Sequence, residues 1–336
     1  MSTPSSVADA GEHTLIELIR RRVPPYPSWV SIGIGDDAAV VEPERNLLEV
    51  LTTDALIDGV HFDRRFTPPA AIGHRALAAN LSDLAAMGAH PRVALLSLML
   101  PPELLVDDLT AMVDGLLSLA ARHKVALVGG NITRTTGPLT VDLTVTGSVH
   151  RRRVLTRAGA RPGDEVWVSG GIGAAAAGLL ALKAGRVSGG TDGASCETAW
   201  LYPEPRLRLG ALLGRNRAAT TCVDLSDGLA DGLQQLAAAS QVGMVVDGGA
   251  LPVPAAARAW FETCGLDPVD AALRGGDDYE LLFTVNPKRR SRMRTVRQGL
   301  GELPLTKIGL VTAAPAVVLN TPAGTVPVPA GYEHFR

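Results

Sequence analysis

Acidic residues stand beside glycines at several points of this 336-residue chain, often two together. Carboxylates gathered on turns repel one another unless cations lie between them. Oxygen ligands without a cluster of His or Cys favour Mg²⁺, which proteins usually hold with one or two carboxylates, water and a substrate phosphate. The sequence therefore predicts a phosphate site with several Mg²⁺ ions. The acidic segments are Gly33–Asp37, Thr52–Asp54, Asn80–Asp83, Asp224–Gly228 and Gly275–Glu280.

Each acidic segment also has a structural interpretation that needs no ligand. Gly-Asp-Asp is common turn chemistry. Ser226 or Asp227 could cap the helix expected after Gly228, where a negative charge also suits the helix dipole. Capping accounts for one of these residues, but not for Asp224, Ser226 and Asp227 together. The recurrence of acids at turns and strand ends favours metal or phosphate contact.

Two glycine-rich segments each follow an expected strand. Gly129-Gly130-Asn131 could admit a phosphate close to the backbone or could only allow close packing. Gly170–Gly173 follows an expected strand and opens an expected helix, so it is superficially similar to a dinucleotide-binding turn. A tight strand–helix turn is the favoured interpretation. The chain also contains no P-loop and no protein-kinase motif set.

The composition describes a soluble globular protein, with 46% hydrophobic and 20% charged residues. A net charge of −2 predicts neither a nucleic-acid partner nor an anionic membrane partner. The basic runs Arg20–Arg22 and Arg151–Arg153 are expected to be solvated surface. Three widely spaced cysteines, with no apolar leader and no long apolar segment, favour a reducing cytoplasmic setting.

A chain of 336 residues predicts two domains. The change to basic residues, Gly and Pro at Arg151–Gly163 places the boundary there. We expect an N-terminal arm and helix over residues 1–30, a first domain over 31–150 and a second over 151–336. The pattern of elements predicts an α/β or α+β fold in both halves.

The acids are expected on particular elements of these domains. A strand over 47–51 should end at Thr53-Asp54, and a helix over 70–87 should carry Asp83 on a different face from its core leucines. A strand over 125–128 should lead into Gly129, and strict alternation over 139–149 predicts a half-buried strand. Further elements are expected as strands over 93–100, 165–169, 220–224, 243–247 and 280–285, and as helices over 103–122 and 228–240.

The acidic segments, in this order and with these neighbours, resemble those of the thiamine-monophosphate kinase family. That family belongs to the superfamily of aminoimidazole ribonucleotide synthetase, selenophosphate synthetase and the hydrogenase-maturation dehydratase. The resemblance implies a two-domain aminoimidazole ribonucleotide synthetase-like fold. Its N-terminal sheet domain would pair with a copy in a homodimer, and its C-terminal α/β domain would complete the nucleotide and substrate site. The most specific stretches are Asn80–Ala89, Leu155–Asp164 and Asp224–Leu229.

The resemblance also implies a reaction and a set of site residues. The reaction is direct in-line transfer of the γ-phosphoryl group of ATP to thiamine monophosphate, giving thiamine diphosphate in its biosynthesis, with several Mg²⁺ ions. The acids with catalytic roles would be Asp37, Asp54, Asp83 and Asp227. The metal ligands would be Asp37, Thr52, Thr53, Asp54, Asp83, Asn131, Asp224 and Asp227. ATP would contact Gly130, Asn131, Arg157 and Ser226, and thiamine monophosphate would contact His61, Asp277 and Tyr332.

The chain departs from the family pattern at two of these positions. The family commonly has Asp where this chain has Asn131, so the loss of one charge predicts weaker binding of one Mg²⁺ ion. It commonly has Glu where this chain has Asp277, which is a milder change. A lone histidine such as His61 is by itself more often a structural residue than a ligand.

Alternatives remain within and outside the superfamily. A selenophosphate synthetase would carry a cysteine or selenocysteine near its N-terminus, whereas the first cysteine here is Cys196. The hydrogenase-maturation protein ends in a reactive cysteine, and this chain ends Glu333-His334-Phe335-Arg336. An alternative of another class is a nucleotide-binding sensor or scaffold of the same fold, in which Asn131 has abolished turnover.

Overall fold

The computed structural model describes residues 6–186 and 196–331. The chain divides into two compact units. The first unit comprises Met1–Leu84 and His90–Val149, and the second comprises Ala85–Ala89 and His150–Arg336. Each unit combines helices with a mixed sheet, which confirms the α/β fold class. Over the described ranges, no helix has the length and apolar character needed to cross a bilayer.

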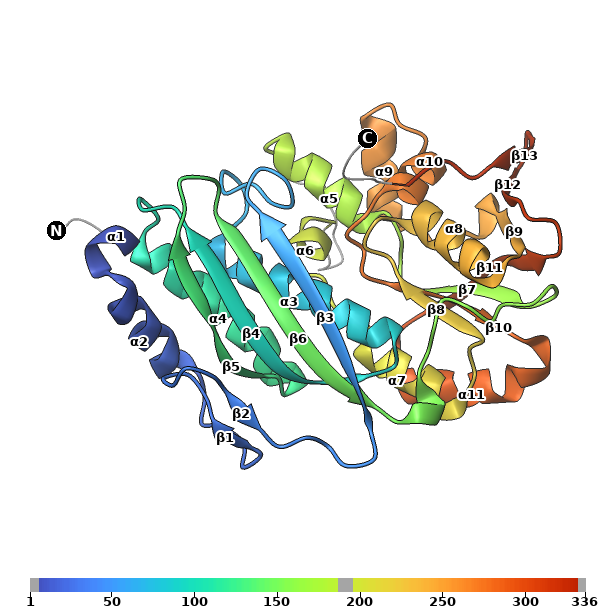
Figure 1. Ribbon diagram of the computed structural model, residues 1–336. Coiled ribbons are helices and arrows are strands. Elements are labelled where there is room, and N and C mark those ends of the chain that lie inside the picture. Colours follow the sequence, from blue (N-terminus) through green and yellow to red (C-terminus); the bar gives the residue numbers. More distant parts are fainter. Residues whose placement is uncertain (1–5, 187–195, 332–336) are drawn as a thin grey trace. The chain divides into compact units, whose positions relative to one another are not determined.

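The first unit is built on a four-stranded sheet with the order β3-β6-β4-β5. Strands β4 and β5 are parallel, and the other neighbours are antiparallel. Helices α3 and α4 lie behind this sheet, and its other face is uncovered in Figure 1. The strands are β1 (Val30–Ile32), β2 (Val40–Val41), β3 (Leu48–Ile57), β4 (His90–Leu100), β5 (Ala126–Arg134) and β6 (Thr140–Val149). The helices are α1 (Val7–Ala10), α2 (Glu12–Arg22), α3 (Pro69–Ala86) and α4 (Val106–His123).

Alternation along β6 explains why the sheet has one covered and one open face. Val141, Leu143 and Val145 are fully buried, whereas Asp142 and Thr144 between them are half-buried. Successive side chains of a strand point to opposite faces, so the apolar set packs under the helices. Helix α3 completes that core with leucines that are also fully buried: Leu77, Leu81 and Leu84.

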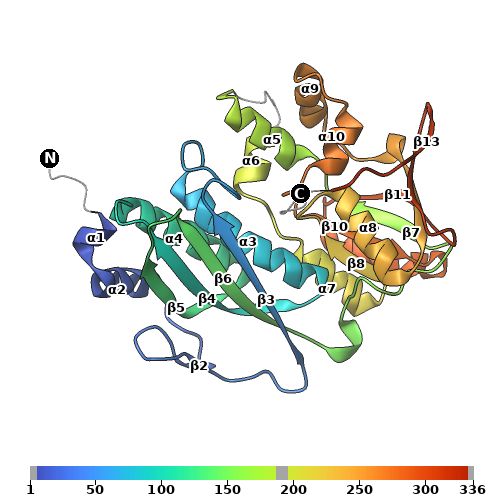
Figure 2. The ribbon, with the colours of Figure 1, turned by 45° about the horizontal axis from the view of Figure 1, so that its top comes forward.

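The second unit is built on a seven-stranded sheet with the order β13-β12-β9-β11-β7-β10-β8. Helices α7 and α11 lie along one face, and α5, α8, α9 and α10 lie along the other (Figures 1 and 2). The strands are β7 (Glu165–Ser169), β8 (Thr221–Asp224), β9 (Gly243–Asp247), β10 (Leu281–Val285), β11 (Leu305–Thr312), β12 (Val317–Thr321) and β13 (Gly324–Pro327). The helices are α5 (Ala174–Lys183), α6 (Cys196–Leu201), α7 (Leu207–Asn216), α8 (Leu229–Ser240), α9 (Ala255–Thr263), α10 (Pro268–Arg274) and α11 (Arg290–Leu300).

Two strands extend further than the sequence pattern predicts. Strand β3 does not end at Thr53-Asp54, because its pairing with β6 continues to Ile57. Strand β5 does not end before Gly129, because its parallel pairing with β4 continues through the glycines to Arg134. In both cases the hydrogen bonds of the sheet override weak local strand propensity. The candidate residues on these strands therefore sit within a sheet rather than on a following turn.

Candidate functional site

The Asp36-Asp37 turn is exposed, and an aromatic side chain anchors the segment that leads to it. The Tyr26 hydroxyl accepts a hydrogen bond from the Ile34 N–H at 3.1 Å and donates one to the Leu127 carbonyl of β5 at 3.2 Å. A Cβ atom at Gly33 would lie 2.1 Å from the Tyr26 ring, so only glycine fits there. Tyr26 thus ties the start of the acidic turn to the sheet and leaves Asp37 facing solvent.

One face of β3 carries an oxygen-rich group with helix α3. The Thr52 hydroxyl donates a hydrogen bond to the Asp83 carboxylate. Asp54 is two residues after Thr52 on the same strand, so both side chains point to the same face. Thr52, Asp54 and Asp83 are each half-buried. The first unit therefore brings two carboxylates and a hydroxyl to the helix-covered side of the sheet.

Thr53 points to the opposite, open face of the same sheet. Its hydroxyl lies 3.2 Å from an Asp142 carboxylate oxygen and 3.1 Å from the Leu143 carbonyl of β6. Asp142 is in register with Ser97 of β4, and Ser97 is in register with Asn131 of β5. Thr53, Asp142 and Asn131 thus share the open face. The structure does not place Thr53 or Asn131 beside Asp54 and Asp83.

Asp142 is a candidate that lies outside the acidic segments of the sequence. Its signal was the alternation over 139–149, in which it is the one charged residue on the polar side. Gly130, by contrast, has a packing role that the structure makes visible. A Cβ atom at Gly130 would lie 1.8 Å from the Leu96 carbonyl oxygen of β4, so the close strand pairing itself requires glycine.

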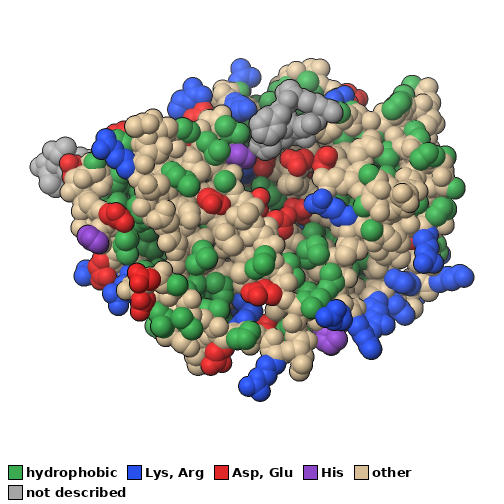
Figure 3. All heavy atoms as spheres, in the orientation of Figure 1, with side chains coloured by type: hydrophobic (Ala, Val, Ile, Leu, Met, Phe, Trp, Pro, Cys, Tyr) green, Lys and Arg blue, Asp and Glu red, His purple; other side chains and the backbone are tan. Residues whose placement is uncertain are grey.

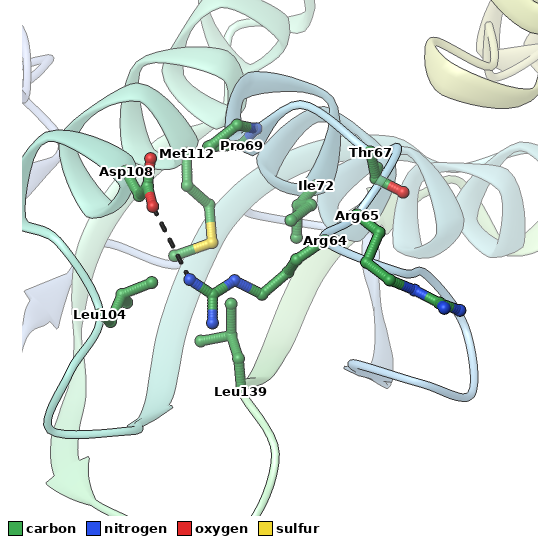
Figure 4. Close-up of a pocket in the computed structure, with 9 residues that line it drawn as sticks. All are labelled: Arg64, Arg65, Thr67, Pro69, Ile72, Leu104, Asp108, Met112 and Leu139. Atoms are coloured by element: carbon green, nitrogen blue, oxygen red, sulfur yellow. Dashed lines mark ion pairs between the residues drawn. The ribbon is translucent and has the colours of Figure 1, made fainter. Parts of the chain in front are cut away.

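His61 holds the loop that follows β3. Its Nδ1 accepts a hydrogen bond from the Ile57 N–H at 3.1 Å, which places the proton of the neutral ring on Nε2. A pocket of about 290 Å³ lies beside this loop (Figure 4). Arg64 crosses the pocket to Asp108 at 3.7 Å, while Arg65 points away from it. The loop is therefore ordered by its own contacts.

The acids of the second unit lie on two segments that are joined by backbone hydrogen bonds. Asp224 is buried at the end of β8, and Ser226 and Asp227 occupy the turn before α8. The Asp277 N–H donates to the Ser226 carbonyl at 2.7 Å. The Tyr279 N–H donates to the Leu225 carbonyl at 3.0 Å, so residues 277–279 run alongside residues 225–226. These backbone bonds fix the Asp277 loop against the Asp224–Asp227 turn.

Asp277 stands in a conformation that non-glycine residues seldom adopt. Its φ is +68°, and that of Tyr279 is +50°. Left-handed backbone at non-glycine residues costs free energy and persists only where surrounding contacts enforce it. The Trp200 indole donates to one Asp277 carboxylate oxygen at 3.1 Å, and the Tyr279 hydroxyl lies 3.3 Å from the other. Strained backbone and paired donors together position this carboxylate, as expected of a functional residue.

Asp278 occupies the N-terminus of helix α5. Its two carboxylate oxygens accept hydrogen bonds from the Gly173 N–H at 2.6 Å and the Ala175 N–H at 3.1 Å. Burial raises the pKa of Asp278 to about 7, with smaller contributions from the nearby Glu280 and Asp277, and the two N–H donors oppose that rise. In a dinucleotide-binding fold these N–H groups would receive a phosphate. Here a carboxylate of the chain fills the position, which agrees with the strand–helix turn expected at Gly170–Gly173.

Arg157 and Tyr332 are the candidates that these groups do not include. The Arg157 side chain is exposed, and its carbonyl accepts a hydrogen bond from the Ser240 hydroxyl at 3.3 Å. Ser240 ends α8, whereas Ser226 precedes its start, and the 12 residues of α8 span about 18 Å. The Arg157 backbone is thus anchored far from Ser226. Tyr332 lies outside the described residues.

The donor groups of each unit suit Mg²⁺ even though none is a complete cage. Among the described residues, no three His, Cys, Asp or Glu side chains are grouped to hold a metal ion. Mg²⁺ does not require such a cage, because it usually binds one or two carboxylates and keeps water and substrate phosphate as its other ligands. Asp54 and Asp83 lie on the helix-covered side of the first sheet, and Asp224 and Asp227 lie three residues apart at the end of β8 and in the turn that follows. We refer to these two sets of carboxylates as the carboxylate pairs.

Comparison with known proteins places the chain in a family. Residues 35–149 match the model of the AIR synthase related protein N-terminal domain, and residues 161–321 match that of the C-terminal domain. The thiamine-monophosphate kinase of Bacillus subtilis is 34% identical, over 97% of this chain and 99% of that protein.

Solved structures give the same answer. The crystal structure of thiamine-monophosphate kinase from Stenotrophomonas maltophilia is 40% identical, with a TM-score of 0.79, over 91% of this chain and 94% of that one. A structure described as AaThiL complexed with AMPPCP and TMP is 31% identical, with a TM-score of 0.75, over 99% of this chain and 100% of that one. The chain belongs to the thiamine-monophosphate kinase family of AIR synthase related proteins.

Proposed function

We propose that the protein transfers the γ-phosphoryl group of ATP to thiamine monophosphate, giving thiamine diphosphate and ADP. The observation that carries this proposal is the near-complete match to a relative solved with AMPPCP and TMP. The two carboxylate pairs, Asp54 with Asp83 and Asp224 with Asp227, supply chemistry that suits such a transfer. The exposed Asp37 would add a further oxygen ligand.

The chemistry of the donors suits a reaction between two anions. ATP and the acceptor phosphate repel each other, and bound Mg²⁺ would offset that repulsion and the charge of a loose transition state. The acceptor phosphate is largely ionised near neutral pH, because its second pKa is about 6. A strong general base is therefore unnecessary. Thr52 would keep Asp83 oriented, and His61 and Asp277 would face the thiamine phosphate.

The uncovered face of the four-stranded sheet supports pairing with a second copy. Leu51 is 68% exposed and Leu95 is 39% exposed on this face, and Figure 3 shows apolar side chains spread across it. We infer that this face joins two first units in a homodimer. Thr53, Asp142 and Asn131 would then be covered by the partner. Loss of dimer in Leu51→Lys by light scattering would support this interface, and an unchanged dimer would contradict it.

The cysteines suit a reducing, cytoplasmic setting. Cys222 and Cys264 are free thiols, and Cys264 is exposed. An exposed thiol persists most readily where thiols are kept reduced. This inference agrees with a small phosphorylated substrate and with ATP as the phosphoryl donor.

The test is an end-point assay with purified protein, ATP, Mg²⁺ and thiamine monophosphate, in which thiamine diphosphate and ADP are separated by chromatography. Controls omit Mg²⁺ or replace the monophosphate with free thiamine. We expect equal amounts of both products, only with the metal and the monophosphate present. ATP binding without product would instead favour a nucleotide sensor, and Asn131→Asp would then be tested for restored turnover.

A further inference from the structure

A basic cavity lies in the second unit, and none of the residues that line it belongs to the candidate site described above. It has a volume of about 410 Å³ and is formed by helix α11 with strands β7 and β11. Its wall carries four cations and one carboxylate beside an indole ring: Arg290, Arg294, Arg297, Lys307, Glu165 and Trp167. Positive charge thus exceeds negative charge in a concave site.

The sequence around α11 concentrates this charge. Between Asn286 and Gly301 the chain contains six cations and no acid: Lys288, Arg289, Arg290, Arg292, Arg294 and Arg297. Figure 3 shows Lys and Arg side chains gathered at the lower right, where Figure 1 places α11. The chain as a whole has a net charge of −2, so this segment is a local exception.

Two cations of the cavity are held by its single carboxylate. The Glu165 side chain is only 4% exposed and pairs with Arg290 at 2.8 Å and with Lys307 at 3.2 Å. These neighbours keep the pKa of Glu165 below its ordinary value despite its burial. The carboxylate therefore stays charged and holds both cations at the cavity.

The other two cations have no acidic partner in the part of the chain that the structure describes. Arg297 lies over the Trp167 ring, with 4.9 Å from its guanidinium carbon to the ring centre. Trp167 is itself fixed, because its indole N–H donates to Glu165 at 3.3 Å. Arg294 stands one turn before Arg297 on the same helix. Stacking pre-orders one guanidinium, and both keep charge that a ligand can use.

We propose that this cavity binds a small anion with two or three linked phosphate groups. A guanidinium can donate two parallel hydrogen bonds to a pair of phosphate oxygens. A guanidinium that is already ordered on an indole ring loses little conformational freedom when a ligand binds. A volume of about 410 Å³ lies in the range of small-molecule sites. The small volume favours a small polyanion over an extended nucleic acid. The same phosphate chain occurs in nucleotides and in inorganic polyphosphate.

The test is calorimetric titration of the full-length protein with inorganic tripolyphosphate in EDTA, so that Mg²⁺-dependent binding elsewhere is absent. We expect salt-sensitive binding that falls about tenfold or more in the double variant Arg294→Gln/Arg297→Gln. The variant Arg186→Gln, an exposed arginine of the same unit outside the cavity, should bind as the wild type does. Thermal unfolding of each variant shows whether it is folded, and Lys307→Gln serves as a second probe of the cavity.

Parallel titrations with ATP, thiamine diphosphate and a short DNA duplex identify the source of the phosphate. ATP or thiamine diphosphate could bind more tightly than tripolyphosphate and lose that binding in the double variant. This result would support the site and identify its ligand. Equal binding of tripolyphosphate, ATP and thiamine diphosphate would support a site for the phosphate chain alone. No binding of tripolyphosphate by the wild type, equal binding by all variants, or binding of the duplex alone would overturn the proposal.

Discussion

The two units hold their candidate residues in different ways. In the first unit, Thr52, Thr53 and Asp54 lie inside a ten-residue strand, and the sheet register decides which face each one reaches. In the second unit, Asp227 and Asp277 lie on turns that are fixed by hydrogen bonds from residues far away in sequence. The candidate residues of the first unit depend on sheet geometry, and those of the second unit depend on buried polar contacts.

This difference predicts different sensitivities to mutation. A sheet supplies many backbone bonds, so single side-chain changes in the first unit should act on chemistry with little effect on folding. The turns of the second unit rely on a few polar groups, so changes there should affect both folding and activity.

The largest effect should follow removal of one carboxylate from either unit. Asp54→Asn and Asp227→Asn should each lower kcat by about 1,000-fold, because each loses charge where Mg²⁺ and phosphate would bind. Steady-state kinetics at saturating Mg²⁺ measures this. Full turnover in both variants would show that neither pair takes part.

The next effect concerns a buried ion pair that supports the turn of the second unit. Glu280 is 4% exposed at its side chain, pairs with Arg206 and accepts a hydrogen bond from Ser169. Glu280→Gln should lower the free energy of unfolding by about 3 kcal/mol, because Arg206 keeps a partly buried charge without its partner. Urea unfolding of the wild type and the variant measures this difference in free energy.

A surface pair provides the control for Glu280. Asp270 and Arg274 pair at 2.9 Å with both side chains more than half exposed. Asp270→Asn should lower the free energy of unfolding by less than about 1 kcal/mol. Equal losses in the two variants would contradict the claim that buried polar contacts hold the candidate residues of the second unit.

A third prediction uses the raised pKa of Asp278. A carboxyl whose pKa rises on folding stabilises the protein below its unfolded pKa, and that contribution is lost as pH rises through about 7. Asp278→Asn cannot ionise, so its stability relative to the wild type should improve from pH 5 to pH 8. Kinetics at each pH should also show about tenfold lower kcat, because Asn offers only one oxygen to the two N–H donors. Unfolding curves that differ by the same amount at both pH values would refute the assignment.

The smallest effect compares neighbouring residues of β3. Thr52→Val removes the hydroxyl that orients Asp83 and should lower activity about tenfold. Thr53→Val changes only the open face and should change activity less than about threefold at equal dimer content. A larger loss in Thr53→Val would place the reaction on the open face.

Regular elements of this fold were predictable where their patterns are local. The strands expected over 165–169 and 243–247 match β7 and β9 at both ends, and the helix expected over 228–240 matches α8 closely. The sequence pattern assigned no element to 290–312, where the structure has α11 and β11. Only Met293 and Val296 of α11 are buried. The helix is otherwise rich in arginine, so its sequence shows too few apolar residues to reveal a helical repeat.

The candidate site was predictable in its residue types and less so in its geometry. Adjacent acids and hydroxyls mark Thr52–Asp54, but strand alternation places Thr53 on the other face from its neighbours. The contacts that position Asp277 and Asp278 come from Trp200 and Gly173, 77 and 105 residues away. Local patterns carry no information about such distant partners.

The most direct test of the proposed reaction follows the phosphorus atom itself. ATP labelled at its γ-phosphate is incubated with the protein, Mg²⁺ and thiamine monophosphate, and the label is located in product and protein. We predict label in the terminal phosphate of thiamine diphosphate, one per ADP formed, and none bound to the protein. Label released as inorganic phosphate without labelled thiamine diphosphate, or label retained on the protein, would contradict direct transfer.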